Sequence, residues 1–153
     1  MMSDIYKVTK LTNPTPVQMD QIMDLWLQGN LDAHSFISRN YWLANVAEVR
    51  GAIKQSELYV ATEHEDKIIG FIGLVNDYAA GLFVATNHRS HGIGSELLKV
   101  AIRTHPHLTL HVYEKNPRAF ELYRRLGFKV ISKQVDDETG EMGYSMEIQK
   151  GTP

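Results

Sequence analysis

The sequence has no cysteine among its 153 residues. This absence excludes disulfides, thiolate metal sites, iron–sulfur clusters and a cysteine nucleophile, and it is compatible with a reducing compartment. Long apolar runs are also missing, because none approaches the roughly 18 residues that a membrane-spanning helix needs. Residues 1–10 lack the basic-then-apolar pattern of a signal peptide. We therefore expect a cytoplasmic protein that does not cross a membrane.

The sequence also lacks an excess of either charge, since it has 16 Lys and Arg and 18 Asp and Glu, which gives a formal net charge of −2. This balance disfavours nucleic acid as a partner, because it supplies no broad basic surface. The chain contains neither repeats nor a Pro-, Gly- or Ser-rich linker, and 43% of its residues are hydrophobic. We predict one domain, residues 1–153, that acts on a small molecule or an exposed peptide.

Apolar and β-branched runs predict strands at 5–9, 58–63, 67–75, 79–85, 108–114, 128–134 and 143–149. Apolar stripes at helical spacing predict one helix from Pro16 to a stop at Gly29–Asn30, a second over 42–53, a third around 97–102 and a fourth at 117–126. This order combines antiparallel hairpins with a parallel crossover. The predicted fold is α/β, with a mixed, mostly antiparallel sheet of about six to seven strands and about four helices on its two faces.

The most informative stretch follows the strand at 79–85, where Arg89, Gly92 and Gly94 lead into a helix. Glycines let backbone N–H groups approach a ligand, a helix N-terminus favours negative charge, and arginine can add a bidentate phosphate contact. The segment therefore suits a pyrophosphate. Leu97 replaces the third glycine of a dinucleotide fingerprint, and no Walker lysine follows Gly94, so neither of those nucleotide motifs is present. A plain glycine turn is the structural alternative.

Arg89-x-x-Gly92-x-Gly94 resembles the acyl-CoA pyrophosphate loop of the GNAT superfamily of N-acetyltransferases. The stretch from Asn116 to Phe128 is similar to the second motif of that family and lies one strand after the loop helix. The two motifs with their flanking strands span about residues 79–134, and the order of elements extends the resemblance to nearly the whole chain. Segments at 25–26, 33–37 and 41–42 resemble small stand-alone bacterial members, the YiaC type in particular.

The resemblance implies transfer of an acetyl group from acetyl-CoA to a primary amine in a ternary complex, with no covalent enzyme intermediate. The acceptor would be a protein lysine, a protein N-terminus or a small amine. Tyr123 matches the general acid of the family, which protonates the leaving thiolate. By the same analogy the cofactor would lie against Leu82, Phe83, Val84, Arg89, Ser90, His91, Gly92, Ile93, Gly94, Ser95, Asn116, Ala119 and Tyr123.

Two of these residues also have structural interpretations. Tyr123 shares a helix face with Phe120 and Leu126, which on its own indicates packing. Asn116 is a good N-cap for a helix that begins at Pro117, a role that is compatible with ligand binding.

The acceptor amine must lose a proton before it attacks, and the sequence offers several bases without deciding among them. We rank His34 first, and Asp77, His111 and Glu114 are the alternatives. Strand alternation places His111 on the face opposite to that of Glu114, so only one of these two can point inward. A chain of water molecules could replace a dedicated base. Each candidate could equally be an ordinary hydrogen-bonded polar residue.

The resemblance also implies that residues before the loop helix form the wall of the acceptor site. Phe36 and Tyr41 lie in an aromatic-rich connection, and Asp77 and Tyr78 precede the cofactor strand. Trp26 and Trp42, together with several apolar residues, belong to the predicted core stripes. The predicted substrate-binding residues are Phe36, Tyr41, Asp77, Tyr78 and His111.

Other functions and partners have weaker support. A GNAT-like module that senses acyl-CoA or docks to a partner without turnover is the main alternative, and retention of Tyr123 argues against it. His105-Pro-His107 lacks a third ligand, so we expect no metal site. The strand at 143–149 could pair across a homodimer or close the sheet of a monomer.

Overall fold

The computed structural model describes residues 6–89 and 92–149. Within these ranges the chain forms a seven-stranded sheet in the order β1-β2-β3-β4-β5-β7-β6 and five α-helices. The strands are β1 (Lys7–Leu11), β2 (Glu57–Glu63), β3 (Lys67–Val75), β4 (Tyr78–Val84), β5 (His107–Tyr113), β6 (Lys129–Val135) and β7 (Met142–Gln149). The helices are α1 (Pro16–Ala33), α2 (Arg39–Ala44), α3 (Val46–Gln55), α4 (Ile93–Thr104) and α5 (Pro117–Arg125), with short 3₁₀ turns at His64–Asp66 and Thr86–His88.

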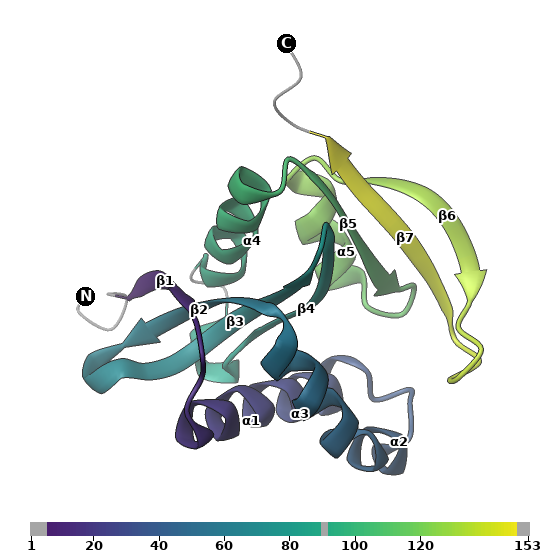
Figure 1. Cartoon of the computed structure of the whole chain (residues 1–153). Helices are drawn as coiled ribbons and strands as arrows, with labels where there is room; N and C mark the ends of the chain where they lie inside the picture. The colour runs from purple at the N-terminus through teal and green to yellow at the C-terminus, as the bar shows by residue number, and fades with distance from the viewer. Residues whose placement is uncertain (1–5, 90–91, 150–153) are drawn as a thin grey trace.

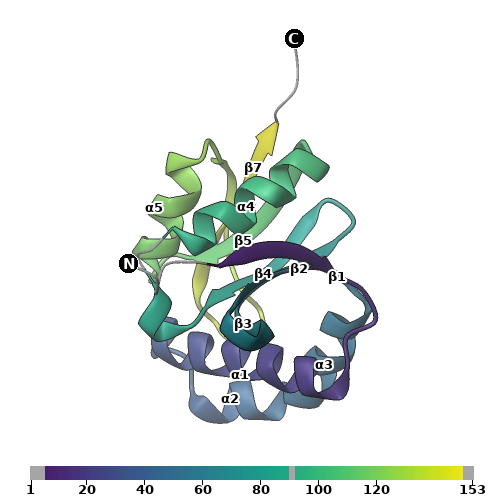
Figure 2. The same ribbon diagram turned by 90° about the vertical axis from the view of Figure 1, so that its left-hand side faces the viewer.

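Helices cover both faces of the sheet (Figure 1). α1, α2 and α3 lie on one face, and α4 and α5 lie on the other, as the rotated view shows most clearly (Figure 2). Each face has its own hydrophobic core. One core joins α1 and α2 to the sheet around Ile22 and Phe71, and the other joins α4 to the sheet around Leu97 and Ile72. The predicted α/β class, with a mixed and mostly antiparallel sheet, is therefore confirmed. No helix of the described ranges is long and apolar enough to cross a membrane.

Local signals in the sequence set most element boundaries. Thr15 begins α1 with a reciprocal capping box to Gln18, and Asn116 caps α5 directly before a proline in the first turn. The polar segment His64–Asp66 closes the β2–β3 hairpin as predicted. Gly127 ends the α5 segment with φ +108°, a left-handed conformation that glycine adopts without strain. The observed strands differ from the predicted ones by one or two residues at their ends, which is the usual scatter of element boundaries.

The predicted stop of the first helix at Gly29–Asn30 was wrong, because α1 continues to Ala33. Both residues are buried inside the helix. A Cβ atom at Gly29 would approach Cδ1 of Phe83 to 2.5 Å, so glycine is required here for close packing against β4. The Asn30 side chain donates to the carbonyl oxygen of Trp26 at 2.9 Å and so does not end the helix.

The second predicted helix is two helices, which gives five helices in place of about four. The chain breaks at Asn45, whose side-chain amide donates to the carbonyl oxygen of Tyr41 at 2.7 Å. The predicted apolar stripe nevertheless faces one hydrophobic core, because Trp42 of α2 and Val49 of α3 both pack there. Side-chain periodicity alone does not reveal such a break when both helices bury the same stripe.

The sheet is weakest between its two central strands. β4 and β5 run parallel, and only Tyr78 with Thr109 and Ala79 with Leu110 pair between them. On its other side, β4 has an irregular register with β3, in which Ala80 has no partner. Beyond these residues β4 and β5 diverge, and their separation creates the main cavity.

Candidate active site

The cavity between β4 and β5 has a volume of about 940 Å³. Its walls come from β4, the start of α4, the end of β5, α5 and the C-terminal part of α1. Of the predicted site residues it brings together His34, Tyr78, Leu82, Phe83, Val84, Arg89, Gly92, Ile93, Gly94, Ser95, His111, Asn116, Ala119 and Tyr123. Ser90 and His91 lie outside the described residues.

The start of α4 is built to accept an anion. Gly92 occupies the N-cap with φ +82° and supplies no side-chain hydrogen bond to the first turn. The unpaired N–H groups of a helix N-terminus, together with the helix dipole, favour a negatively charged ligand. A Cβ atom at Gly94 would lie 3.6 Å from Leu122 and 3.8 Å from Val84, so a side chain there would begin to fill the cavity. These glycines therefore keep the backbone accessible.

Arg89 is positioned by two contacts. Its Nε donates to the carbonyl oxygen of Val84 at 3.4 Å, and its guanidinium lies 3.5 Å from a carboxylate oxygen of Asp32. The same carboxylate accepts a hydrogen bond from the Thr86 hydroxyl at 3.1 Å. The end of α1 thus holds the segment after β4 in place. Asp32 was not among the predicted residues, because nothing local in the sequence indicates that the end of α1 meets this segment.

Tyr123 reaches the cavity from α5. Its ring packs edge-on against Phe128, with the ring centroids 5.9 Å apart, so the packing interpretation holds for the ring. The hydroxyl has no hydrogen-bond partner among the residues that the structure describes. Burial, with a smaller contribution from Tyr78, raises the pKa of Tyr123 to about 12. The phenol therefore carries its proton at neutral pH and can donate it to a basic atom in the cavity.

A chain of hydrogen bonds connects α1 with the start of α5. Nδ1 of His34 lies 2.8 Å from Oδ1 of Asn30, and Nε2 lies 3.1 Å from Nδ2 of Asn116. The Asn30 amide nitrogen already donates to Trp26, so its oxygen accepts from His34. The Asn116 oxygen accepts from the N–H of Ala119, so its amide nitrogen donates to His34. These contacts assign the proton of His34 to Nδ1 and the acceptor role to Nε2.

His34 is enclosed by aromatic rings. It stacks on Trp42 at 5.8 Å and meets the ring of Tyr113 edge-on at 4.9 Å. Burial lowers the pKa of His34 to about 4. The imidazole is therefore neutral at neutral pH, and both of its nitrogens already have partners.

Several predicted acceptor residues lie elsewhere. Phe36 packs against the rings of His34 and Tyr113 without reaching the cavity. The Tyr41 hydroxyl donates to Glu138 at 2.9 Å, which ties α2 to the β6–β7 turn. Both residues lie behind rings that line the cavity, and their direct contact with substrate stays a prediction.

Glu114 is also outside the cavity, because Lys133 holds its carboxylate at 2.9 Å on the exposed surface. It is therefore not a base in this site.

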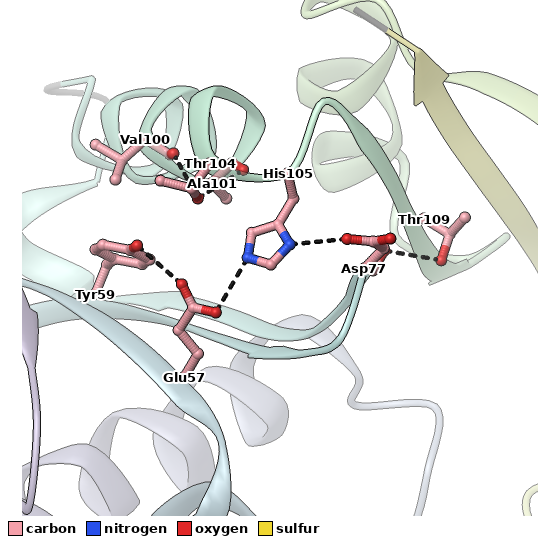
Figure 3. Close-up of polar contacts among 8 residues, drawn as sticks. All are labelled: Glu57, Tyr59, Asp77, Val100, Ala101, Thr104, His105 and Thr109. Atoms are coloured by element: carbon pink, nitrogen blue, oxygen red, sulfur yellow. Dashed lines mark hydrogen bonds and ion pairs between the residues drawn. The ribbon is translucent and has the colours of Figure 1, made fainter.

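Asp77 does not line the cavity, and it belongs to a separate polar cluster (Figure 3). His105, at the end of α4, lies 2.8 Å from Asp77 and 3.1 Å from Glu57. These two carboxylates raise the pKa of His105. Tyr59 donates to the other oxygen of Glu57 at 2.9 Å. The cluster joins α4 to β2 and the β3–β4 turn, which gives Asp77 a structural role, and its contact with substrate stays a prediction.

Comparisons with known proteins bear on this arrangement. Residues 19–128 match the family model described as the acetyltransferase (GNAT) family. The chain belongs to the GNAT family. It is 33% identical to the peptidyl-lysine N-acetyltransferase YiaC of Escherichia coli K12, over 80% of this chain and 84% of that protein. It is 29% identical to the peptidyl-lysine N-acetyltransferase YjaB of the same strain, over 80% of this chain and 83% of YjaB.

Solved structures agree on the fold of this GNAT protein. The solution structure of apo YjaB from Escherichia coli superposes with a TM-score of 0.81 at 24% identity, covering 96% of this chain and 99% of YjaB. The PaiA N-acetyltransferase of Thermoplasma acidophilum, solved in complex with coenzyme A, gives 0.74 at 18% identity, covering 95% and 99% of the two chains. The predicted family, its YiaC-type relationship and the enzyme class are confirmed, and the GNAT chain is an acetyltransferase.

Asn30 is the main functional candidate in this GNAT chain that sequence reasoning missed. It is 4% exposed and is the one buried polar residue among those that the structure describes. The spacing of four residues between Asn30 and His34 would have placed both side chains on one face of α1. The predicted helix stop concealed this signal.

Proposed function

We propose that this GNAT enzyme transfers the acetyl group of acetyl-CoA directly to a primary amine, with both substrates bound at once and Tyr123 as the general acid. The main support is one cavity that contains both an uncapped helix N-terminus and a phenol with a raised pKa. Relatives named as peptidyl-lysine N-acetyltransferases favour a lysine side chain of a protein as the acceptor. A cytoplasmic location stays part of the proposal and is compatible with the absence of cysteine.

The residues along the cavity fit the parts of acetyl-CoA. The N–H groups at the start of α4, with Arg89 beside them, would bind the pyrophosphate. Leu82, Phe83 and Val84 of β4 would lie along the pantetheine arm, since β5 leaves this edge of β4 unpaired beyond Ala79. Backbone donors on this edge would also stabilise negative charge on the thioester oxygen.

Tyr123 would act when the carbon–sulfur bond breaks. The amine, once neutral, forms a bond from its nitrogen to the thioester carbon and loses a second proton to water, and the bond between that carbon and sulfur breaks with its electron pair on sulfur. The Tyr123 hydroxyl gives its proton to the departing sulfur, so the second product leaves as a thiol. Because the pKa of Tyr123 is about 12, the phenol carries this proton before the step, and water would restore it afterwards.

The test is release of free thiol from acetyl-CoA by purified protein, with separate pools of lysine peptides, peptides with a free N-terminus and small amines. Tyr123→Phe should lower kcat by about 10²–10⁴-fold, the usual contribution of a general acid, and should leave the Kd for acetyl-CoA within about twofold. Tyr144→Phe is the matched control, because Tyr144 packs against Phe120 and bonds to the exposed Glu114 away from the cavity.

Two results would contradict the proposal. Full activity of Tyr123→Phe would remove Tyr123 from the mechanism. Saturable binding of acetyl-CoA without thiol release from any pool would favour a non-catalytic module that senses acyl-CoA.

A further inference from the structure

The last turn of α1 and its C-cap contact two different walls of the cavity. The Asp32 carboxylate lies 3.5 Å from the guanidinium of Arg89, in the segment after β4. Two positions later, Nε2 of His34 lies 3.1 Å from Nδ2 of Asn116, at the start of α5. One short stretch of the chain therefore connects the proposed pyrophosphate site with the helix that carries the proposed acid.

The contact between His34 and Asn116 lies at the end of the cavity where β4 and β5 are apart. Leu110 is the last residue of β5 that pairs with β4, and Asn116 follows it by six positions, beyond the end of β5. Each residue of a strand adds a rise of about 3.3 Å, so the last backbone pair lies well before this end. Side chains from α1 make the connection there instead.

α1 packs closely on the sheet at this point. A Cβ atom at Gly29 would lie only 2.5 Å from Cδ1 of Phe83 on β4. The next residue, Asn30, is buried, and its side-chain oxygen accepts the Nδ1 proton of His34 at 2.8 Å. A hydrogen bond at one ring nitrogen orients a histidine and fixes which nitrogen can accept. Asn30 therefore directs the lone pair of Nε2 towards Asn116.

Asn116 in turn determines where α5 begins. Its side-chain oxygen accepts from the N–H of Ala119 at 3.3 Å and so caps the helix. Tyr123 follows Asn116 by seven positions, which is about two helical turns, so both side chains lie on one face of α5, and both line the cavity. Since α5 has nine residues, a shift of its first turn moves Tyr123 as well.

We infer that Asn30 and His34 are positioning residues that hold the start of α5 so that the Tyr123 hydroxyl meets the departing sulfur, a role that rests on the proposed function. His34 keeps its proton on Nδ1 and takes none at Nε2, because Asn116 donates there. The two residues therefore act on the step in which Tyr123 gives up its proton. They do not act on the binding of acetyl-CoA by the start of α4.

The test compares two replacements of His34 in the thiol-release assay with a lysine peptide. Glutamine can donate to Asn30 and accept from Asn116, whereas leucine keeps apolar packing against Trp42 and Tyr113 but makes neither hydrogen bond. His34→Leu should lower kcat by about tenfold or more, because a displacement of about 1 Å can cost about 10²-fold. His34→Gln should stay within about twofold of the wild type, and the Kd for acetyl-CoA should stay within about threefold in both variants.

A second variant and a control separate this effect from a loss of folding. Asn30→Ala leaves the imidazole in place but removes the acceptor of its Nδ1 proton, so it should also lower kcat and leave the Kd for acetyl-CoA unchanged. His107→Leu is the matched control, because His107 is exposed and pairs with Glu147 outside the cavity. Its kcat should equal that of the wild type. Circular dichroism and acetyl-CoA binding show which variants are folded, and Asn30→Ala decides if His34→Leu is not.

A double variant tests whether His34 acts through Tyr123. If it does, His34→Leu with Tyr123→Phe should be no more than about twofold slower than Tyr123→Phe alone, because residues that act as a unit do not contribute independently. Losses that multiply in the double variant would overturn the inference. Full activity of His34→Leu would also overturn it.

Equal losses in His34→Gln and His34→Leu would overturn the inference as well and would favour proton transfer at His34, since glutamine keeps the hydrogen bonds but cannot take a proton. Each of these results leaves the proposed function intact, provided that Tyr123→Phe is impaired. Wild-type protein that releases no thiol would overturn both the proposed function and the positioning role.

Discussion

The neutral state of His34 makes the stability of the fold depend on pH in a way that one substitution can isolate. In the native protein the pKa of His34 is about 4, because its ring is buried among aromatic rings. In the unfolded chain the pKa is about 6.5. Between these values the unfolded state binds a proton that the native state does not bind. The free energy of unfolding therefore falls as pH decreases through this range.

The size of the effect follows from the two pKa values. Lowering the pH from about 7.5 to about 5.0 should reduce the free energy of unfolding by about 2 kcal/mol through His34 alone. The pKa values of two other histidines are also shifted, and in opposite directions, because burial lowers the pKa of His111 and two carboxylates raise that of His105. A variant that keeps His105 and His111 has the same contributions from them, so these cancel when its change in the free energy of unfolding is subtracted from that of the wild type.

His34→Gln is that variant, since glutamine can donate to Asn30 and accept from Asn116 without titrating. Guanidinium chloride unfolding at both pH values gives four free energies. We expect the wild type to lose about 2 kcal/mol more than the variant between the two conditions. Equal pH dependence of the two proteins, within about 0.5 kcal/mol, would refute the view that His34 is held neutral by its surroundings.

Two further predictions concern other parts of the fold. His105 has a raised native pKa, so its bonds to Asp77 and Glu57 stabilise the protein most below about pH 6.5, and this contribution is lost as pH rises through the native pKa. The free energies of unfolding of the wild type and His105→Gln should therefore differ more at about pH 5.5 than at about pH 8.5. A larger difference at the higher pH would contradict the pairing. Gly127→Ala should lower the free energy of unfolding by about 1–3 kcal/mol, because φ is +108° and the new Cβ atom would lie 3.2 Å from Ile148. Gly140 has φ +74° but open space around it, so Gly140→Ala should lower the free energy of unfolding by less. Thermal melts of both variants test this order.

The parts of the fold that the sequence predicts are those determined by neighbouring residues. Thr15, Asn116 and Gly127 mark helix ends through their own hydrogen bonds or dihedral angles, and the structure has all three at the expected places. The same is true of Gly92 at the start of α4. Resemblance to the family then named residues that the structure brings together around one cavity, because the family's motifs are contiguous in sequence.

The contacts on the α1 side of the cavity could not be predicted, because they join distant elements. Asn116 and His34 are 82 positions apart and meet only after α1 packs beside α5's first turn. Tyr41 is directed away from the cavity by Glu138, 97 positions later in the chain. Asn30 resembled a helix stop, because propensity cannot show that its side chain will be buried.

The two-pair junction between β4 and β5 has a consequence for how the molecule holds together. Neighbouring strands elsewhere share at least five register pairs, so the sheet consists of two extensively paired halves, β1–β4 and β5–β7–β6. Only two register pairs join these halves, and we call this boundary between β4 and β5 the seam. A ligand that fills the seam contacts both halves and bridges them as a strand would. Binding free energy then adds to the cohesion of the native state. If acetyl-CoA is that ligand, as proposed, its binding should raise the free energy of unfolding, and its release should lower it again.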